Sequence, residues 1–296
     1  MKILNFGSMN LDHSYEVDHF VRPGETLAAQ SVEISCGGKG LNQSVALARA
    51  GALVWHGGCV GRGGEPLLAL LQASGVNTTC LRPVDVPQGH AVIQLEAGGE
   101  NCILLYGGSN RAVTPAQIEQ TIARFEPGDW LLLQNEVNGL SALLAAGAAR
   151  GLTIALNPSP CDAALAELDL SSVAWLILNK GEAEQLTGFA EPERVRAALH
   201  RRWPQMRVVL TLGAAGSVLL APEGVWRQPA YPAQAVDTTG AGDTFTGYFL
   251  AGLLRGLPWA RCLEMASCAA ALSVMRPGTA DSIPILQQVE AALERA

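Results

Sequence analysis

Short strand-like runs alternate with helix-like segments along most of this chain, and that alternation constrains the fold more than any other feature. The strands are predicted at 3–6, 53–59, 130–134, 152–157, 175–179 and 208–212. The helices between them are predicted near 39–50, 64–74, 114–125, 138–150 and 181–187. A hairpin and two long helices follow, at 217–220, 225–228, 243–255 and 259–274. The pattern indicates an α/β fold with a mostly parallel sheet covered by helices.

Two regions do not fit the alternation. Residues 11–36 and 89–105 carry strand patterns with no helix between them, as in Ser31–Ser35 and His90–Leu95. We expect them to form a small antiparallel sheet that acts as a lid over one edge of the core. The chain is therefore predicted to be a single domain spanning 1–296, with lid segments at about 11–36 and 89–105.

Composition narrows the class of protein. The 296 residues are 49% hydrophobic and 16% charged, enough to bury a large core. A net charge of −7, with no basic cluster beyond Arg201, Arg202 and Arg207, argues against binding nucleic acid. The apolar runs fall far short of the ~18 residues that a membrane helix needs, so we expect no membrane partner and a cytoplasmic location. The seven cysteines include no C-x-x-C pair, which predicts reduced thiols.

The segment 236–245 brings a glycine-rich turn to a predicted helix start. Backbone N–H groups of Gly240, Ala241 and Gly242 could approach an anion closely there, and the helix dipole favours negative charge. Asp243 would then be placed to take a proton from a hydroxyl as a phosphoryl group arrives. The alternative is a glycine-capped turn with Asp243 as its N-cap. The segment is neither a dinucleotide fingerprint nor a Walker A loop.

Three motifs stand in order along the chain: Gly7–Asp12 (GSMNLD), Cys36–Asn42 (CGGKGLN) and Asp237–Asp243 (DTTGAGD). The first resembles a sugar-binding motif of the ribokinase family, the PfkB-type carbohydrate kinases. The second resembles that family's Gly-Gly-Lys-Gly-x-Asn signature, and the third resembles its other signature. The resemblance covers essentially the whole chain. It implies a ribokinase-like three-layer α/β/α core with a β-sheet lid, and transfer of the γ-phosphoryl group of ATP to a sugar hydroxyl.

A sugar presents a ring of hydroxyls, so its recognition needs convergent carboxylates, amides and an ammonium. The resemblance implies sugar contacts by Asn10, Asp12, Gly38, Lys39, Asn42, Glu136 and Asp243, with Ala91, Ile93 and Leu105 from the lid. Taken singly, Asn10 and Asp12 could be turn formers and Lys39 a solvated charge. Glu136 could be a charge at a helix N-terminus.

The sequence constrains the identity of the sugar less than it constrains the type of reaction. D-ribose, phosphorylated on its primary 5-hydroxyl, is the expected substrate. Fructose, 2-keto-3-deoxygluconate or a nucleoside are alternatives of the same class, because one hydroxyl or methylene is worth only ~1–3 kcal/mol in an unspecialised pocket. An inactive sugar- or nucleotide-binding protein is the alternative of a different class, and the intact Asp243 argues against it.

The resemblance also implies a nucleotide site. Asn179-x-x-Glu182 matches the family motif whose oxygens could organise Mg²⁺ around the phosphates. Its alternative is a capping box at a helix start. The other implied nucleotide contacts are Thr211, Gly213, Ala214, Gly216, Gly242 and Ser267. Ala214 stands where relatives often have a polar side chain, so contacts through the backbone are expected there.

A K⁺ site is implied as well, formed mostly by carbonyl oxygens. The matching positions are Asp237, Thr239, Ser273, Arg276, Gly278 and Ser282. The alternative is a buried loop whose carbonyls are satisfied by water.

We also expect a homodimer formed through the lids. A small sheet with one face toward the sugar must bury or solvate its other face. Val32, Ile34, Ile93 and Leu95 lie on alternating strands and cannot all point inward. The predicted partners are therefore a sugar, ATP and a second copy of the chain.

Overall fold

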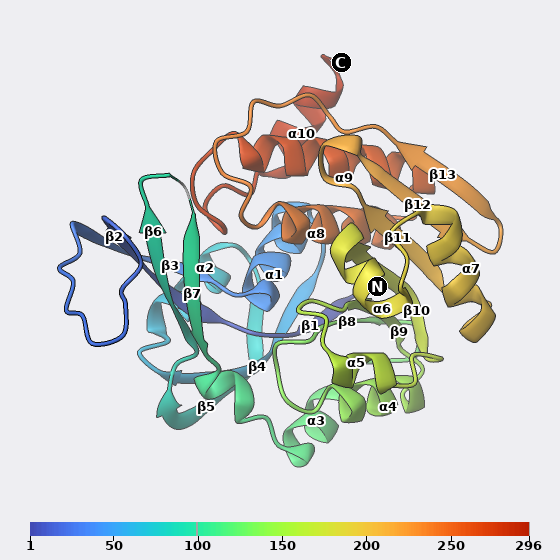
Figure 1. Ribbon diagram of the computed structural model, residues 1–296. Coiled ribbons are helices and arrows are strands. Elements are labelled where there is room, and N and C mark those ends of the chain that lie inside the picture. The colour runs from blue at the N-terminus through green and yellow to red at the C-terminus, as the bar shows by residue number, and fades with distance from the viewer. Residues whose placement is uncertain (99, 296) are drawn as a thin grey trace.

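A large sheet forms the centre of the molecule, in a computed structural model that describes residues 1–98 and 100–295 (Figure 1). Its strands are β1 (Ile3–Phe6), β4 (Val54–Arg62), β5 (Asn77–Pro87), β8 (Trp130–Gln134), β9 (Thr153–Asn157), β10 (Val173–Asn179), β11 (Arg207–Thr211), β12 (Ser217–Ala221) and β13 (Gly224–Gln228). They lie in the order β13-β12-β11-β10-β9-β8-β1-β4-β5. Neighbours from β11 to β5 are parallel, whereas β12 and β13 add an antiparallel hairpin.

Helices cover both faces of this sheet. One layer contains α1 (Lys39–Arg49), α2 (Glu65–Ala73), α8 (Ala241–Leu254), α9 (Trp259–Val274) and α10 (Leu286–Leu293). The other contains α3 (Pro115–Ile122), α4 (Leu140–Ala149), α5 (Ala163–Glu167), α6 (Lys180–Thr187) and α7 (Pro192–Arg202). Figure 1 shows α8, α9 and α10 on the opposite side of the sheet from α3, α4 and α5. The expected three-layer α/β/α core is confirmed.

Each central strand is buried on both faces. On β8, Trp130 and Leu132 pack into the core beneath α1 and α8, while Leu131 and Leu133 pack into the core beneath α3 and α4. Full burial of such a side chain contributes roughly 1.5–3 kcal/mol to the stability of the fold. Because both faces of these strands are covered, their sequences are continuous apolar runs. None of the helices in the described part of the chain is long and apolar enough to cross a membrane.

Local sequence signals set several helix ends. The Thr114 side chain accepts a hydrogen bond from the Gln117 amide, and Pro115 occupies the first position of α3. Helix α1 ends at Arg49 and is followed by Gly51 with φ of 88°. Both boundaries follow the sequence prediction to within a residue or two.

A second, smaller sheet projects from one edge of the core (Figure 1). It contains β3 (Ser31–Gly37), β2 (Asn10–Val17), β6 (His90–Glu96) and β7 (Asn101–Tyr106), in that order. The expected second sheet is present, but it is mixed rather than purely antiparallel, because β2 and β6 pair in parallel. These two strands continue from β1 and β5, which run in the same direction in the large sheet, so they enter the small sheet in the same direction.

Candidate active site

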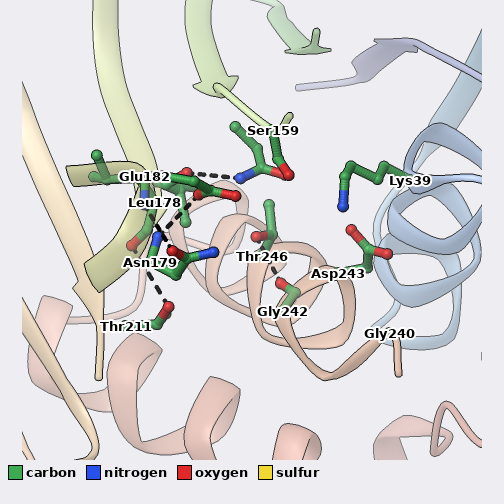
Figure 2. Close-up of a pocket in the computed structure, with 12 residues that line it drawn as sticks. Lys39, Ser159, Leu178, Asn179, Glu182, Thr211, Gly240, Gly242, Asp243 and Thr246 are labelled. Carbon is green, nitrogen blue, oxygen red and sulfur yellow. Dashed lines mark hydrogen bonds between the residues drawn. The ribbon is translucent and has the colours of Figure 1, made fainter. Parts of the chain in front are cut away.

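A cleft of about 200 Å³ lies at the carboxyl ends of β9, β10 and β11, beside the first turns of α1, α6 and α8 (Figure 2). Open α/β sheets bind ligands at this edge because parallel strands end there together. The predicted site residues in its lining are Lys39, Asn179, Glu182, Thr211, Gly240, Gly242 and Asp243. Polar lining residues that the sequence analysis missed are Asn157, Ser159 and Thr246.

The glycine-rich turn forms the start of α8. Gly240 is the N-cap residue and has φ of 74°, a left-handed conformation that side chains other than glycine rarely adopt. The Ala241 amide donates to the Thr238 carbonyl at 3.3 Å. Within the described residues, the Gly242 amide donates to no backbone carbonyl, and Gly242 is exposed at the cleft. In this conformation Gly242 is therefore better placed than Ala241 to receive an anion.

Asp243 is buried, with 8% of its surface exposed, and does not cap the helix, so the N-cap interpretation was wrong. Its Oδ2 accepts a hydrogen bond from Asn42 Nδ2 at 3.0 Å. Its Oδ1 accepts one from Gln43 Nε2 at 2.8 Å. Two consecutive residues of α1 therefore hold the two oxygens of a carboxylate on α8.

The Lys39 ammonium is directed toward the Asp243 carboxylate (Figure 2). Burial by itself would lower the pKa of Lys39, but nearby carboxylates, first that of Asp243 and then that of Glu136, raise it above its ordinary value. The lysine therefore stays protonated at neutral pH. It supplies positive charge between the cleft and the predicted sugar residues, so it is not a solvated surface charge.

The first sugar motif is held by a residue that the sequence analysis missed. Asn10 is buried, and its Oδ1 accepts a hydrogen bond from Asn110 Nδ2 at 2.7 Å. Asn110 also accepts from the Met9 amide at 3.0 Å and donates to the Met9 carbonyl at 3.1 Å. Asn110 lies in a short 3-10 turn, Gly108–Arg111, far along the chain from the motif that it fixes. No local sequence pattern identifies that contact.

Asp12 and the predicted lid residues form one row of the small sheet. Asp12 on β2 pairs with Ala91 on β6, and Ala91 pairs with Leu105 on β7. Ile93 is two residues further along β6 and shares this face. Burial, and then the negative charge of Glu136, raises the pKa of the Asp12 carboxyl to about 6. The structure therefore brings the polar and apolar parts of the predicted sugar set onto the same face.

Glu136 follows β8 in the chain, and its carboxylate lies against the N-terminus of α1. Its Oε2 accepts a hydrogen bond from the Lys39 amide at 3.2 Å and another from the Ser8 hydroxyl. Gly38 precedes the helix as its N-cap with φ of 93°. A carboxylate at a helix N-terminus is favoured by the dipole, so Glu136 combines its predicted place near the sugar with a structural role.

Asn42 is only partly satisfied by the protein. Its Nδ2 donates to Asp243, but its buried Oδ1 accepts no hydrogen bond within the described residues. An unpaired buried acceptor costs roughly 1–3 kcal/mol, so a donor such as a sugar hydroxyl would fit this position.

On the nucleotide side, Asn179 and Glu182 form the capping box of α6. The Glu182 amide donates to Asn179 Oδ1 at 2.9 Å, and the Asn179 amide donates to Glu182 Oε2 at 3.0 Å. The structural alternative for this motif is thus correct, and both residues still line the cleft. Within the described residues, no cluster of three or more histidine, cysteine or acidic side chains is placed to hold a metal ion.

The remaining predicted nucleotide residues divide into two groups. Thr211 ends β11 in the cleft, and Gly213, Ala214 and Gly216 follow in a turn whose first residues are exposed. Ser267 on α9 is buried outside the cleft. Its hydroxyl donates to the Pro229 carbonyl at 3.2 Å and accepts from the Tyr231 amide at 3.0 Å. This hydroxyl is already engaged by the protein and does not line the cleft.

The predicted cation residues come together in two adjoining loops. Asp237 accepts hydrogen bonds from the Thr239 amide at 2.9 Å and the Gly278 amide at 3.0 Å, which ties the loops together. Partial burial by itself would raise the pKa of Asp237, but hydrogen bonds from Thr239 and Gly278 together lower it below its ordinary value. The Ser282 hydroxyl donates to the Thr279 carbonyl at 2.9 Å. The Ser273 hydroxyl donates to the Ala270 carbonyl at 2.8 Å, and the Ser273 carbonyl accepts from the Arg276 amide at 3.2 Å.

Comparison with known proteins assigns the family. Residues 1–286 match the family described as pfkB family carbohydrate kinase. The chain belongs to this family. It is 37% identical to the ribokinase of Haemophilus influenzae over 98% of this chain and 97% of that protein. It is 31% identical to the deoxyribokinase of Salmonella typhi, with 97% of each chain covered.

A solved structure extends the likeness to the whole fold. The ribokinase of Arabidopsis thaliana, in complex with ribose and ATP, matches this pfkB-family kinase with a TM-score of 0.87 and 29% identity. The match covers 99% of this chain and 98% of that one. The predicted family, the ribokinase-like fold and the class of enzyme, an ATP-dependent carbohydrate kinase, are confirmed.

Proposed function

We propose that the chain transfers the γ-phosphoryl group of ATP to the primary 5-hydroxyl of D-ribose. One observation carries the assignment: a buried carboxylate, Asp243, stands between the cleft and the predicted sugar residues with both oxygens fixed by Asn42 and Gln43. The ribokinases of Haemophilus influenzae and Arabidopsis thaliana support ribose as the acceptor. The chain is proposed to act as one kinase domain in the cytoplasm, where ATP is available.

The residues suggest the course of the reaction. Asp243 takes the proton of the 5-hydroxyl as that oxygen attacks the γ-phosphorus, and the bond from the phosphorus to the bridging oxygen of ADP breaks. The Gly242 amide and the Lys39 ammonium stabilise negative charge on the transferred group. Closure of the small sheet over the sugar would exclude water that otherwise consumes ATP.

Mg²⁺ is proposed to accompany ATP. When bound, the ion neutralises phosphate charge and orients the phosphates for in-line transfer. Asn179 and Glu182 offer amide and carboxylate oxygen at the cleft, of the hard type that Mg²⁺ prefers, and Glu182 uses only one of its two oxygens in the capping box. Two protein ligands suit an ion that keeps most of its coordination to water and phosphate.

K⁺ is proposed to bind between the Asp237 loop and the 273–282 loop. Within the described residues, the carbonyl oxygens of Thr239, Arg276 and Gly278 accept no backbone hydrogen bond, so they are available to a monovalent cation. Such an ion would reinforce the links that Asp237 already makes between the loops. Its effect on turnover would be indirect, through the turn that carries Gly242.

A homodimer formed through the small sheet is also proposed. The exposed apolar side chains on this sheet include Val32 at 55%, Ile34 at 58% and Leu104 at 71% exposed. Pairing places these three on the face opposite Asp12. Exposed apolar side chains on one face of a small sheet favour association with a second copy. Light scattering that shows only monomer at micromolar concentration would contradict it.

The substrate is tested by a coupled assay of ADP release over pentoses, hexoses, keto-deoxy acids and nucleosides. Ribose is expected to give the highest kcat/KM, and deoxyribose is the informative neighbour because the Salmonella typhi relative is a deoxyribokinase. A hexose or nucleoside more than about tenfold better than ribose would overturn the choice of sugar and leave the kinase assignment intact. No ADP release with any sugar, despite binding, would favour the inactive binding protein.

A further inference from the structure

A chain of buried amide side chains connects the centre of the large sheet to Asp243. Asn5 Oδ1 on β1 accepts a hydrogen bond from Gln134 Nε2 on β8 at 2.9 Å. The same nitrogen donates to Gln43 Oε1 on α1 at 2.7 Å. Gln43 Nε2 then donates to Asn157 Oδ1 on β9 at 2.9 Å and to Asp243 Oδ1 at 2.8 Å. Three adjacent strands of the sheet are thereby linked to the carboxylate.

Gln43 is the centre of this network. Its side chain is fully buried, as are those of Asn5 and Gln134, and burying an amide is costly unless its polar atoms are paired. The Gln43 nitrogen donates to Asn157 and to Asp243, and its oxygen accepts from Gln134. We propose that Gln43 is a positioning residue that fixes the orientation of the Asp243 carboxylate for proton transfer. This inference rests on the proposed function of Asp243 as the base.

Asn42 and Gln43 hold the same carboxylate in different ways. Asn42 donates to Oδ2 and keeps an unpaired buried oxygen, within the described residues, that fits a sugar hydroxyl. Gln43 donates to Oδ1 and has its amide oxygen and nitrogen engaged by the protein. Loss of Asn42 should therefore affect both sugar binding and turnover. Loss of Gln43 should affect turnover alone, because it frees the carboxylate to rotate about its side-chain bonds.

The decisive experiment is a double-mutant cycle between Gln43→Met and Asp243→Asn. In the otherwise unchanged enzyme, Gln43→Met should lower kcat by about 10- to 100-fold, the scale of a misplaced catalytic group, with KM for ribose and ATP changed by less than about threefold. In the Asp243→Asn background, the same substitution should change the residual rate by less than about twofold, because groups that act as one unit are not additive.

Gln117→Met is the matched control. Gln117 is also a buried glutamine, and it donates to the Gly58 carbonyl at 2.6 Å and accepts from the Cys59 thiol. It lies outside the cleft lining and the Asp243 network, so its loss should lower the melting temperature without lowering kcat. Gln43→Glu is the second variant, because it keeps the shape and can still accept from Gln134, yet its carboxylate form cannot donate to Asp243. It should lower kcat at least as much as Gln43→Met.

Two results would overturn the proposal. One is a kcat for both Gln43 variants within about twofold of the unchanged enzyme. The other is an equal fractional loss with Asp243 present and in the Asp243→Asn background, which would indicate a general disturbance of the fold. Failure of the proposed function would look different, since the unchanged enzyme would then phosphorylate no sugar.

Discussion

The proposed sugar-facing half of the site is buried and fixed by side chains, whereas the proposed nucleotide-facing half is more open and includes an exposed turn that offers mainly backbone groups. Asn10, Asn42 and Asp243 are between 4% and 8% exposed, and each is hydrogen-bonded to another side chain. Gly213 and Ala214 in the nucleotide turn are exposed. A small polar ligand gains affinity and orientation from groups that are held in place before it binds. Phosphates need little more than amides and positive charge. Substitutions should therefore be most damaging on the sugar side.

The largest effect is expected for Asp243→Asn. The substitution preserves size but removes the base, so kcat should fall by ~10²–10⁴. Binding of ribose, followed by calorimetry, should persist because Asn10 and Lys39 are unchanged. Measured at saturating ATP, a kcat within threefold of the unchanged enzyme would remove Asp243 from the mechanism.

Asp12→Asn comes next, and its effect should depend on pH. Hydrogen bonds to a charged group are worth about 1.5–3 kcal/mol, so the Kd for ribose should rise by about 10- to 100-fold at pH 8. Because the Asp12 pKa is about 6, the unsubstituted protein should lose ribose affinity as pH falls through 6, whereas the variant should show no such loss. Calorimetric titration at pH 5, 6 and 8 checks this, and parallel pH profiles would contradict it.

The same shift has a consequence for stability. The folded pKa of Asp12 lies above the ordinary value of 3.8, so the folded state binds more protons than the unfolded state from about pH 4 to 6. Asp12 therefore increases the free energy of unfolding below pH 4, and this stabilisation is lost as pH rises through 6. Replacing Asp12 with Asn should reduce that part of the pH dependence in urea titrations.

A smaller effect is expected at the cation loops. Turnover in potassium salt should exceed that in tetramethylammonium salt at matched ionic strength by about tenfold, a typical coupling between two sites. Asp237→Ala should abolish the difference because it removes the two hydrogen bonds that link Thr239 and Gly278 through Asp237. Asp169→Ala is the matched control and should keep the response, because Asp169 also accepts a hydrogen bond from a backbone amide two residues further on but lies outside both loops. Equal rates in the two salts would exclude the K⁺ site.

The smallest effect is expected in the nucleotide turn. Ala214→Ser changes an exposed side chain, and surface substitutions usually stay within about 0.5 kcal/mol, so KM for ATP should change by no more than about twofold. A tenfold change in KM for ATP, with KM for ribose unchanged, would show that side chains in this turn contact the nucleotide after all.

Much of the fold was predictable because burial on two faces leaves a strong pattern. Strands such as Trp130–Gln134 are continuous apolar runs, and the start of α3 is marked by Thr114 and Pro115. Strand β5 was missed because it lies at the edge of the sheet, where prolines such as Pro83 and Pro87 are tolerated and conceal a strand. Helix α7 was missed because its surface is largely charged, with few apolar residues to mark a period.

The site was predictable where its residues lie inside the motifs. Asp243, Lys39 and the lid row with Asp12 could be named from the sequence, although that naming used the family resemblance as well as the residue chemistry. Contacts between distant segments could not be predicted, as Asn110 with Asn10 shows. Gln43 was a different kind of omission. It directly follows Asn42 in the second motif, yet its hydrogen bond to Asp243 depends on how α1 packs on α8.

The most direct test of the proposed chemistry is to identify the product formed from ATP and D-ribose. We expect one ADP and one ribose 5-phosphate per turnover, seen by phosphorus and carbon NMR as coupling between phosphorus and carbon 5. The Asp243→Asn variant should form the same product far more slowly. Phosphate attached at another carbon, or free phosphate released without a phosphorylated sugar, would contradict the placement of the 5-hydroxyl beside Asp243.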